Sequence, residues 1–104
     1  MRTRTVSLHE VSERDLLRHV RAIAEVLGWR VFHCWNSLHS PAGMPDLILC
    51  RPPRLIFMEL KSDKGKVTAA QQAWLDDLAQ IPGIETMVVR PLFWYAGQVE
   101  ELLR

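Results

Sequence analysis

The sequence predicts an α/β domain in which helices flank a mixed central β-sheet. Apolar residues recur at helical spacing over residues 12–27. Three short runs rich in β-branched and aromatic residues follow between residues 29 and 60, and a second helical stretch then precedes a fourth such run. This order of helix, three strands, helix and strand, closed by a C-terminal helix, favours the α/β class.

Length and composition limit the class of protein. A chain of 104 residues suits one domain, so we expect residues 1–104 to form a single unit with its core over residues 12–90. The hydrophobic share of 48% is enough for a packed core. The net charge of +1 excludes a generally basic coat protein, so any nucleic-acid binding must come from locally placed charge.

Other features indicate the compartment. No run of about 18 apolar residues is present, which excludes a membrane-spanning helix. The polar residues 1–15 lack the apolar stretch of a secretory signal. Cys34 and Cys50 are too few for a zinc cage or a disulfide framework. We therefore expect a cytoplasmic protein.

The first helix is expected over residues 12–27. Ser12 is a favourable N-cap, and Gly28 is a typical stop after the last turn. One face carries an apolar stripe of Leu16, Leu17, Val20, Ile23, Ala24 and Leu27.

Three strands are expected next, at residues 29–35, 47–50 and 55–60. Residues 36–44 form a loop between the first two. Residues 51–54 form a hairpin connection between the second and the third.

The C-terminal half continues with a polar loop at residues 62–67. Thr68 then caps a helix that extends to Gln80. A fourth strand is expected at residues 85–90, and residues 94–103 form a last amphipathic helix.

Glu13 is the first charged residue that does not fit its surroundings. It lies three, four and seven residues before Leu16, Leu17 and Val20, which places it within the inward stripe. It is either a first-turn carboxylate that the helix dipole stabilises or a functional acid.

Asp46 and Glu59 form the second anomaly. If residues 51–54 are the hairpin loop, Asp46 lies directly opposite Glu59 in the antiparallel pair. Two carboxylates at about 5 Å repel unless positive charge lies between them. Carboxylate and backbone oxygens suit Mg²⁺ or Mn²⁺, so the pair predicts a divalent cation.

Lys61 joins this pair because side chains alternate along a strand. Glu59 and Lys61 point to the same side, while Leu60 points into the core and leaves its carbonyl near the site. A lysine there can align a water or stabilise charge on a phosphorane. The alternative is a Glu–Lys pair at the surface.

Gln71 is the third anomaly. We expect it on the inner face of its helix with Ala70, Trp74 and Leu78. The alternative is a capping box, in which Gln71 reaches back to Thr68. Both roles are compatible if the start of the helix borders the site.

These residues resemble the PD-(D/E)xK nuclease superfamily. The matching pieces are Pro45-Asp46 and, after twelve intervening residues, Glu59-Leu60-Lys61, with Glu13 on the preceding helix. More narrowly, the chain is similar to a standalone VRR-NUC domain over residues 12–90. The similarity rests on S-E-R-D-L at residues 12–16, G-M-P-D-L at 43–47, F-M-E-L-K at 57–61 and V-T-A-A-Q-Q-A-W at 67–74.

The resemblance implies a restriction-endonuclease-like fold and metal-dependent hydrolysis of DNA phosphodiesters. It implies Asp46, Glu59 and the Leu60 carbonyl as ligands of Mg²⁺, for which Mn²⁺ would substitute. Lys61 matches the active-site lysine, Glu13 the carboxylate that orients the water, and Gln71 the glutamine of the following helix. Small standalone members resemble Holliday-junction resolvases and act as homodimers. We expect the domain to act without the additional domains of larger repair enzymes, so that its substrate can differ from theirs.

Substrate contacts are expected from Lys64 and Lys66, which follow the strand of the site, and from His39 and Ser40 in the loop before Asp46. Other polar side chains receive structural assignments. Arg51 and Arg54 lie at the far end of the hairpin, and we expect Arg14, Arg18 and Arg21 to form a solvated face rather than a DNA track. His33 is expected to be a hydrogen-bonded strand residue rather than a ligand.

The four tryptophans suggest base stacking as one interpretation. Because Trp74 lies on the inward stripe, we expect it in the core. Trp35 and Trp94 are candidates for a homodimer surface.

Three other functions stay open. The first is a restriction-type or nicking endonuclease on ordinary duplex DNA, which a comparison of cleavage of a four-way junction and of a linear duplex would distinguish. The second is a DNA-binding or assembly module without catalysis, against which the presence of Glu13, Asp46, Glu59, Lys61 and Gln71 argues. The third is a structural domain whose polar anomalies are caps and surface pairs, and an absence of Mg²⁺ binding would support it.

Overall fold

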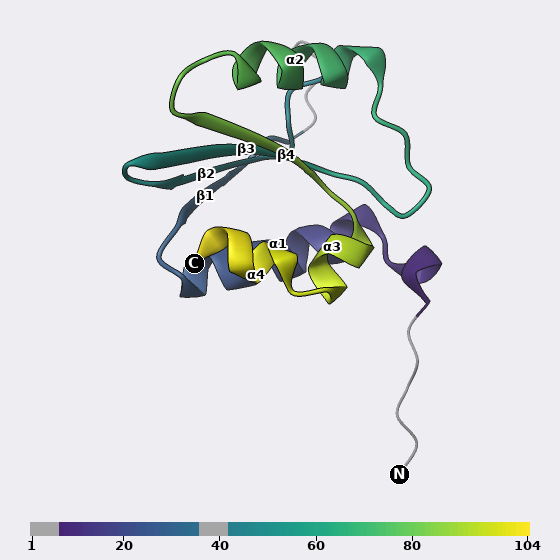
Figure 1. Cartoon of the computed structure of the whole chain (residues 1–104). Helices are drawn as coiled ribbons and strands as arrows, with labels where there is room; N and C mark the ends of the chain where they lie inside the picture. The colour runs from purple at the N-terminus through teal and green to yellow at the C-terminus, as the bar shows by residue number, and fades with distance from the viewer. Residues whose placement is uncertain (1–6, 36–41) are drawn as a thin grey trace.

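The computed structural model describes residues 7–35 and 42–104, and these form one mixed four-stranded sheet with helices on both faces (Figure 1). β1 pairs antiparallel with β2, and β2 with β3, while β4 runs parallel to β3. The predicted α/β class is confirmed. In order across the sheet, the strands are β1 (Arg30–His33), β2 (Leu47–Arg51), β3 (Arg54–Leu60) and β4 (Ile84–Val89).

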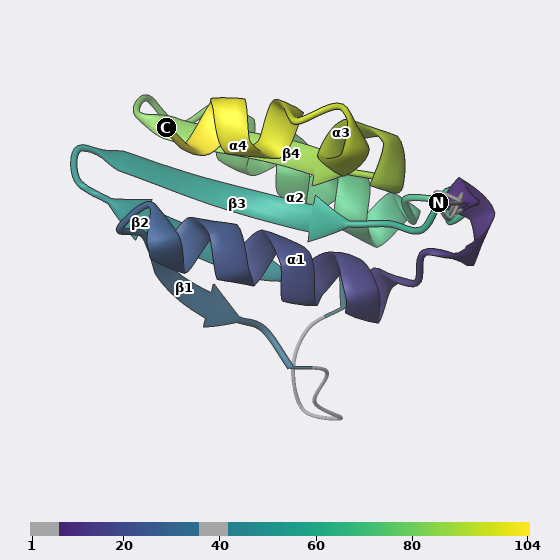
Figure 2. The same ribbon diagram turned by 90° about the horizontal axis from the view of Figure 1, so that it is seen from below.

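The helices divide unequally between the two faces of the sheet. α1, α3 and α4 lie on one face and α2 on the other (Figure 1), and α1 extends along the sheet in the view from below (Figure 2). Within the described residues, no helix has the length and apolar character needed to cross a membrane. The helices are η1 (Leu8–Glu10), α1 (Glu13–Val26), α2 (Ala69–Ala79), α3 (Pro91–Tyr95) and α4 (Gln98–Leu103).

α1 begins and ends where local signals predict. The Ser12 hydroxyl accepts a hydrogen bond from the backbone N–H of Asp15 at 3.0 Å, which satisfies one free donor of the first turn. Gly28 follows the helix with φ of +86°, a left-handed conformation that stops it at little cost.

The core lies between α1, α4 and the sheet. Side chains of α1 at helical spacing meet the face of the sheet that points toward them, and the Trp29 indole N–H donates to the Leu103 carbonyl at 2.8 Å. This layer therefore covers one face of the sheet. Its buried members are Leu16, Val20, Ala24, Trp29, Leu47, Leu49, Ile56, Met58, Leu60, Val89, Val99 and Leu103.

The β2–β3 hairpin has the predicted register. Cys50 lies opposite Leu55 and Ile48 opposite Phe57. Arg51 and Arg54 are also paired, so the loop contains only Pro52 and Pro53 rather than the four residues predicted. The shorter loop leaves the register unchanged, because the two added partners continue the same pairing.

The prediction of one C-terminal helix over residues 94–103 is wrong. The segment forms α3 and α4, which meet at Gly97 with φ of +75°. Pro91 starts α3 earlier than predicted, since proline suits the first turn of a helix. The left-handed glycine then turns the chain, so that Val99 and Leu103 of α4 reach the core.

The expectation that Trp74 lies in the core is also wrong. Trp74 is 37% exposed, and Leu75 is the buried residue of α2. α2 packs mainly against β4, so its inward face is centred on Leu75 rather than on its neighbour. Trp74 is therefore free to line an opening beside the helix.

Candidate active site

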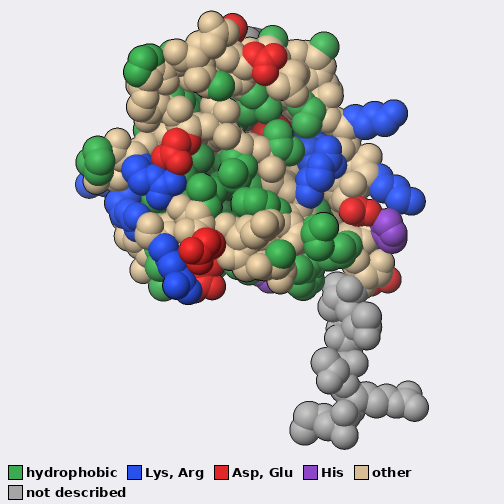
Figure 3. Space-filling view, in the orientation of Figure 1, with side chains coloured by type: hydrophobic (Ala, Val, Ile, Leu, Met, Phe, Trp, Pro, Cys, Tyr) green, Lys and Arg blue, Asp and Glu red, His purple; other side chains and the backbone are tan. Residues whose placement is uncertain are grey.

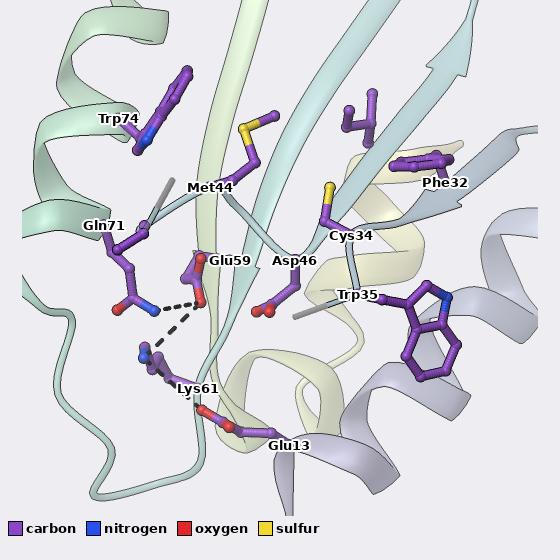
Figure 4. A pocket seen from close by; sticks show the side chains of 13 residues that line it. Glu13, Phe32, Cys34, Trp35, Met44, Asp46, Glu59, Lys61, Gln71 and Trp74 are labelled. Atoms are coloured by element: carbon purple, nitrogen blue, oxygen red, sulfur yellow. Dashed lines mark hydrogen bonds and ion pairs between the residues drawn. The ribbon is translucent and has the colours of Figure 1, made fainter. Parts of the chain in front are cut away.

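A cavity of about 690 Å³ opens beside α2, and all five predicted catalytic residues line it (Figure 4). Their catalytic roles stay predictions, but the structure brings them together from distant parts of the sequence. The five are Glu13, Asp46, Glu59, Lys61 and Gln71.

Each side chain reaches the cavity from the end of an element. Glu13 is the first residue of α1, and Gln71 lies in the first turn of α2. Asp46 immediately precedes β2, while Glu59 and Lys61 lie at and just beyond the end of β3. The caps at Ser12 and Thr68 fix the starts of both helices and hence the positions of Glu13 and Gln71.

Gly43 is required for this arrangement. It has φ of +96°, and a Cβ atom there would lie 2.5 Å from the backbone carbonyl of Ala70 in α2. Only glycine permits both the backbone conformation and the close approach. The segment that leads to Asp46 is thereby held against the start of α2.

Glu59 is the most buried charged residue of the site, with an exposed fraction of 2%. Its Oε1 accepts a hydrogen bond from Gln71 Nε2 at 3.3 Å and lies 3.9 Å from Lys61 Nζ. Its Oε2 has no hydrogen-bond partner among the described residues. A buried carboxylate oxygen without a partner is costly, which indicates a site built for a further group.

Burial raises the pKa of Glu59 to about 8, and the adjacent Asp46 carboxylate adds to the rise. The Lys61 ammonium opposes this shift in the pKa without cancelling it. Asp46 and Glu59 therefore repel each other when both are ionised, as the register predicts. A nearby positive charge would stabilise both carboxylates.

Asp46 is held by the ends of two strands. Its Oδ2 accepts a hydrogen bond from the backbone N–H of Leu60 at 2.7 Å, and its carbonyl accepts one from the N–H of Cys34 at 2.8 Å. These two bonds fix the residue between β1 and β3. The Asp46 side chain consequently lies beside the Glu59 carboxylate (Figure 4).

Lys61 is nearly buried, and its Nζ lies between two acids, 3.9 Å from Glu59 Oε1 and 4.0 Å from Glu13 Oε1. Glu13 differs from the prediction, because its side chain is 54% exposed and lies at the rim rather than within the inward stripe. As the first residue of α1 it has no preceding turn to cover it. The rim position leaves Glu13 open to solvent and to substrate.

Gln71 has both of the roles considered for it. Its Oε1 accepts from the backbone N–H of Thr68 at 2.9 Å, while the Thr68 hydroxyl accepts from the Gln71 N–H at 3.1 Å, which completes a capping box. Its Nε2 donates to Glu59. The same side chain therefore caps α2 and supports the buried carboxylate.

The donor set fits a divalent cation with few side-chain ligands. Within residues 7–35 and 42–104, no three His, Cys, Asp or Glu side chains gather as a metal cluster. The Asp46 and Glu59 carboxylates are hard oxygen donors of the kind that Mg²⁺ prefers. The unpartnered Glu59 Oε2 and the adjacent Asp46 are where such an ion would relieve repulsion.

The rest of the cavity wall is apolar, and sequence reasoning missed most of it. Burial raises the pKa of the Cys34 thiol, and Asp46 adds to that rise, so the thiol stays protonated. Strand alternation would have found this wall, because Phe32, Cys34 and Ile48 share a face with Asp46 in the observed register. The apolar lining residues are Phe32, Cys34, Trp35, Met44, Ile48 and Trp74.

Two of the predicted DNA contacts lie in the loop after β3. Lys64 and Lys66 are exposed in the loop after β3, and Figure 3 shows basic side chains projecting from the edge that carries this loop. Arg90 holds the loop by donating to the Ser62 and Gly65 carbonyls at 2.9 and 2.6 Å. His39 and Ser40 lie outside the described residues.

The two hairpin arginines have structural partners, as their distance from the site predicts. Arg51 donates to the Leu27 and Leu103 carbonyls at 2.9 and 3.0 Å. Arg54 forms two hydrogen bonds with Glu85 at 2.7 and 2.8 Å, and this ion pair lowers the pKa of Glu85.

The arginines of α1 separate into two groups. Arg18 and Arg21 pair with Asp15 and Glu25 on the exposed face, as a solvated face predicts. Arg14 instead lines a second cavity of about 350 Å³, which it shares with Glu13 and Asp46.

His33 lies in β1, as a strand residue. Its Nδ1 is buried without a hydrogen-bond partner among the described residues, and its ring lies 4.3 Å from that of Trp35. One aromatic prediction needs correction. Trp94 packs against the core and stacks on His19 at 5.3 Å, which makes it unsuitable as a free dimer surface. Trp35 is 76% exposed and remains a candidate.

Comparisons with known proteins agree on one domain type. The family model for the VRR-NUC domain matches residues 3–90. A solved structure described as a VRR-NUC domain superposes with a TM-score of 0.67 at 20% identity, covering 89% of this chain and 96% of that chain. No curated protein matches. At 20% identity the structural likeness shows a shared fold.

Proposed function

The chain belongs to the VRR-NUC domain family, whose members are nucleases, and on that premise we propose that it is a metal-dependent DNA endonuclease. The proposed reaction is hydrolysis of a phosphodiester bond. The proposed substrate is branched DNA such as a Holliday junction, as for the standalone members that the sequence resembles.

One observation supports the proposal above the others. The buried carboxylate of Glu59 lies against Asp46 with one oxygen unpartnered, and Lys61 lies 3.9 Å from its other oxygen. A structural Glu59–Lys61 ion pair would need no second carboxylate beside it, and the buried oxygens of Glu59 would all have hydrogen-bond partners. The arrangement suits a cation and a phosphate.

Asp46, Glu59 and the Leu60 carbonyl would hold Mg²⁺ or Mn²⁺. When bound, the ion would supply Lewis-acid polarisation of the scissile phosphate and would favour ionisation of water. Gln71 keeps the Glu59 carboxylate oriented through its hydrogen bond at 3.3 Å.

The other residues position the reactants. Glu13, exposed at the rim, accepts a hydrogen bond from the attacking water and orients it. The attacking water loses one proton to solvent, and its oxygen forms a bond to phosphorus while the bond from phosphorus to the leaving oxygen breaks. The leaving oxygen takes up one proton from solvent. The Lys61 ammonium donates to the phosphate oxygen on which negative charge increases.

The proposal includes a homodimer in the cytoplasm, where Cys34 and Cys50 remain free thiols. A protomer of 12.0 kDa has little surface with which to hold the arms of a junction. Light scattering at micromolar concentration is expected to give twice the mass of one chain, and a monomer would contradict this part.

A cleavage assay tests the proposal. Four-way junction, flap, single-stranded and linear duplex DNA are incubated with wild type or Lys61→Ala in Mg²⁺, Mn²⁺ or EDTA. We expect preferential cleavage of the junction in Mg²⁺ or Mn²⁺, none in EDTA, and a loss of about 100-fold or more in Lys61→Ala. Arg104→Ala, a surface cation at the C-terminus, is the matched control for lost positive charge.

The outcomes separate the alternatives. Equal rates on junction and linear duplex would indicate a nicking or restriction-type enzyme. Binding without cleavage in any metal would indicate a non-catalytic module. Cleavage that persists in EDTA would contradict the metal-dependent mechanism.

A further inference from the structure

The sheet face that carries the candidate site is only half covered by helix. α2 packs mainly against β4, whereas Phe32 on the edge strand β1 is 60% exposed. The observed register places Phe32 opposite Ile48, and Ile48 opposite Phe57, so an apolar strip crosses this face. The opposite face, by contrast, is closed by α1 and α4.

This strip is continuous with the acidic centre. Phe32 and Trp74 line the same cavity as Asp46, Glu59 and Lys61 (Figure 4). Phe32 comes from β1 and Trp74 from α2, and Asp46 lies between these two elements in the view. One cavity therefore has a charged end that suits a phosphate and an apolar end with aromatic rings.

We propose that the aromatic end of the cavity is a stacking subsite for an unpaired nucleobase adjacent to the cleaved phosphate. Phe32 and Trp74 supply the rings, and Trp35 adds a third at the rim. The inference rests on the proposed function, because the acidic centre defines where the phosphate lies.

A nucleobase fits the subsite better than other apolar groups. The cavity of about 690 Å³ has room for a nucleotide, and pockets for small ligands have volumes of about 300–1,000 Å³. A base is covalently attached to the phosphate that the charged end would bind, so both ends are filled by one group. Base–aromatic stacking contributes about 1–3 kcal/mol per base without reading sequence.

The subsite defines a class of substrate. Bases inside a duplex are stacked on one another and cannot reach a protein ring unless they are flipped out. A strand with unpaired nucleotides beside the cut, such as a flap, a single strand or a branch point at which base pairs have opened, presents its bases freely. The cavity therefore favours these substrates over an intact linear duplex.

The test compares two strands with the same phosphates. Labelled ten-nucleotide oligothymidylate and an abasic strand of equal length are titrated by fluorescence anisotropy in Ca²⁺, with wild type, Phe32→Ala, Trp74→Ala and Phe32→Leu. Tyr95→Ala is the matched control, since Tyr95 is a half-exposed aromatic residue on α3, across the sheet from α2. Thermal unfolding checks that every variant is folded.

Wild type is expected to bind oligothymidylate about tenfold or more tightly than the abasic strand. Phe32→Ala and Trp74→Ala should each lose about tenfold for oligothymidylate and leave the abasic strand unchanged. Phe32→Leu, which keeps the apolar volume but not the ring, should lose affinity as well, and Tyr95→Ala should behave as wild type.

Equal binding of the two strands by wild type, binding of neither, or full affinity in the ring variants would overturn the proposal. Cleavage in Mg²⁺ is measured separately. If wild type cleaves DNA but the ring variants bind normally, the proposed function stands and the stacking subsite is rejected. If binding depends on the bases but no DNA is cleaved, the subsite stands and the proposed function is rejected.

Discussion

Glu59 determines the chemistry of the site at the scale of single residues. Its side chain is buried beside a second carboxylate, and burial raises its pKa to about 8. An ionised carboxylate in this position is costly without a cation, while a protonated one is tolerated. The metal-free protein should therefore be more stable when Glu59 holds a proton.

The free energy of unfolding should therefore depend on pH. Because the pKa of Glu59 is raised in the folded protein, protonated Glu59 contributes to stability. This contribution is fully present below about pH 4.5 and is lost as the pH rises through about 8. Gln has no ionisable proton, so the stability of Glu59→Gln should not change in this way. In EDTA, its free energy of unfolding should therefore rise relative to that of wild type between pH 5 and pH 8. The rise should be a few kcal/mol at most, since one pKa unit is about 1.4 kcal/mol. Urea unfolding at both pH values measures the difference.

The same variant should lose nearly all cleavage in Mg²⁺. A difference in unfolding free energy that stays constant from pH 5 to pH 8 would contradict the raised pKa of Glu59. Glu100→Gln, an exposed acid in an i,i+4 pair with Arg104, is the control and should show no comparable dependence.

Two substitutions separate the capping role of Gln71 from its support of Glu59. Gln71→Ala removes the hydrogen bond to Glu59 and half of the capping box, whereas Thr68→Ala removes only capping. Each should cost about 1 kcal/mol of stability. Cleavage rates measured well below both melting temperatures should fall about tenfold or more in Gln71→Ala only. Equal rates in the two variants would reduce Gln71 to a cap.

At the scale of elements, the far end of the β2–β3 hairpin is tied to the C-terminal helix. Arg51 and Arg54 both lie over the Trp29 ring, at 4.5 and 5.1 Å, and both donate to carbonyls at the end of α4. These contacts connect β3 to the layer that closes the opposite face. They hold the strand that carries Glu59 and Lys61.

Arg54→Ala should therefore lower the free energy of unfolding without changing the binding or cleavage of DNA. It leaves Glu85 without its bidentate partner and the Leu102 carbonyl without its donor, at a cost of about 1–3 kcal/mol. Denaturant unfolding measures this loss. Cleavage well below the melting temperature should equal that of wild type, and a large fall in affinity for DNA would show that Arg54 contacts substrate.

Local signals predicted the elements best where a cap or a turn fixes them. Ser12, Gly28 and Thr68 set the helix ends, and the hairpin set the register that brings Asp46 to Glu59. These signals depend only on neighbours in the chain, so the sequence alone reveals them.

The errors depended on tertiary packing. The inward face of α2 is set by its position over β4, which leaves Trp74 at the cavity. The left-handed Gly97 divides a segment whose apolar spacing predicted one helix. The half-covered sheet, and with it the exposure of Phe32, follows from where α2 lies and not from the composition of β1.

At the scale of the whole molecule, the first turns of α1 and α2 supply Glu13 and Gln71 to the cavity that the end of β3 enters. The positive ends of both helix dipoles lie toward this cavity, which reduces the repulsion between the Asp46 and Glu59 carboxylates. The remaining negative charge is what a divalent cation would offset. The central claim is that Asp46 and Glu59 form this cation site.

Mn²⁺ binding, followed through the electron paramagnetic resonance signal of the free ion, tests that claim most directly. Wild type should remove Mn²⁺ from solution at a saturable site, and Mg²⁺ should displace it. Asp46→Asn, which keeps an acceptor for the Leu60 N–H, should lose this binding by about tenfold or more. A wild type that leaves all Mn²⁺ free, or an Asp46→Asn variant that binds it equally well, would contradict the account.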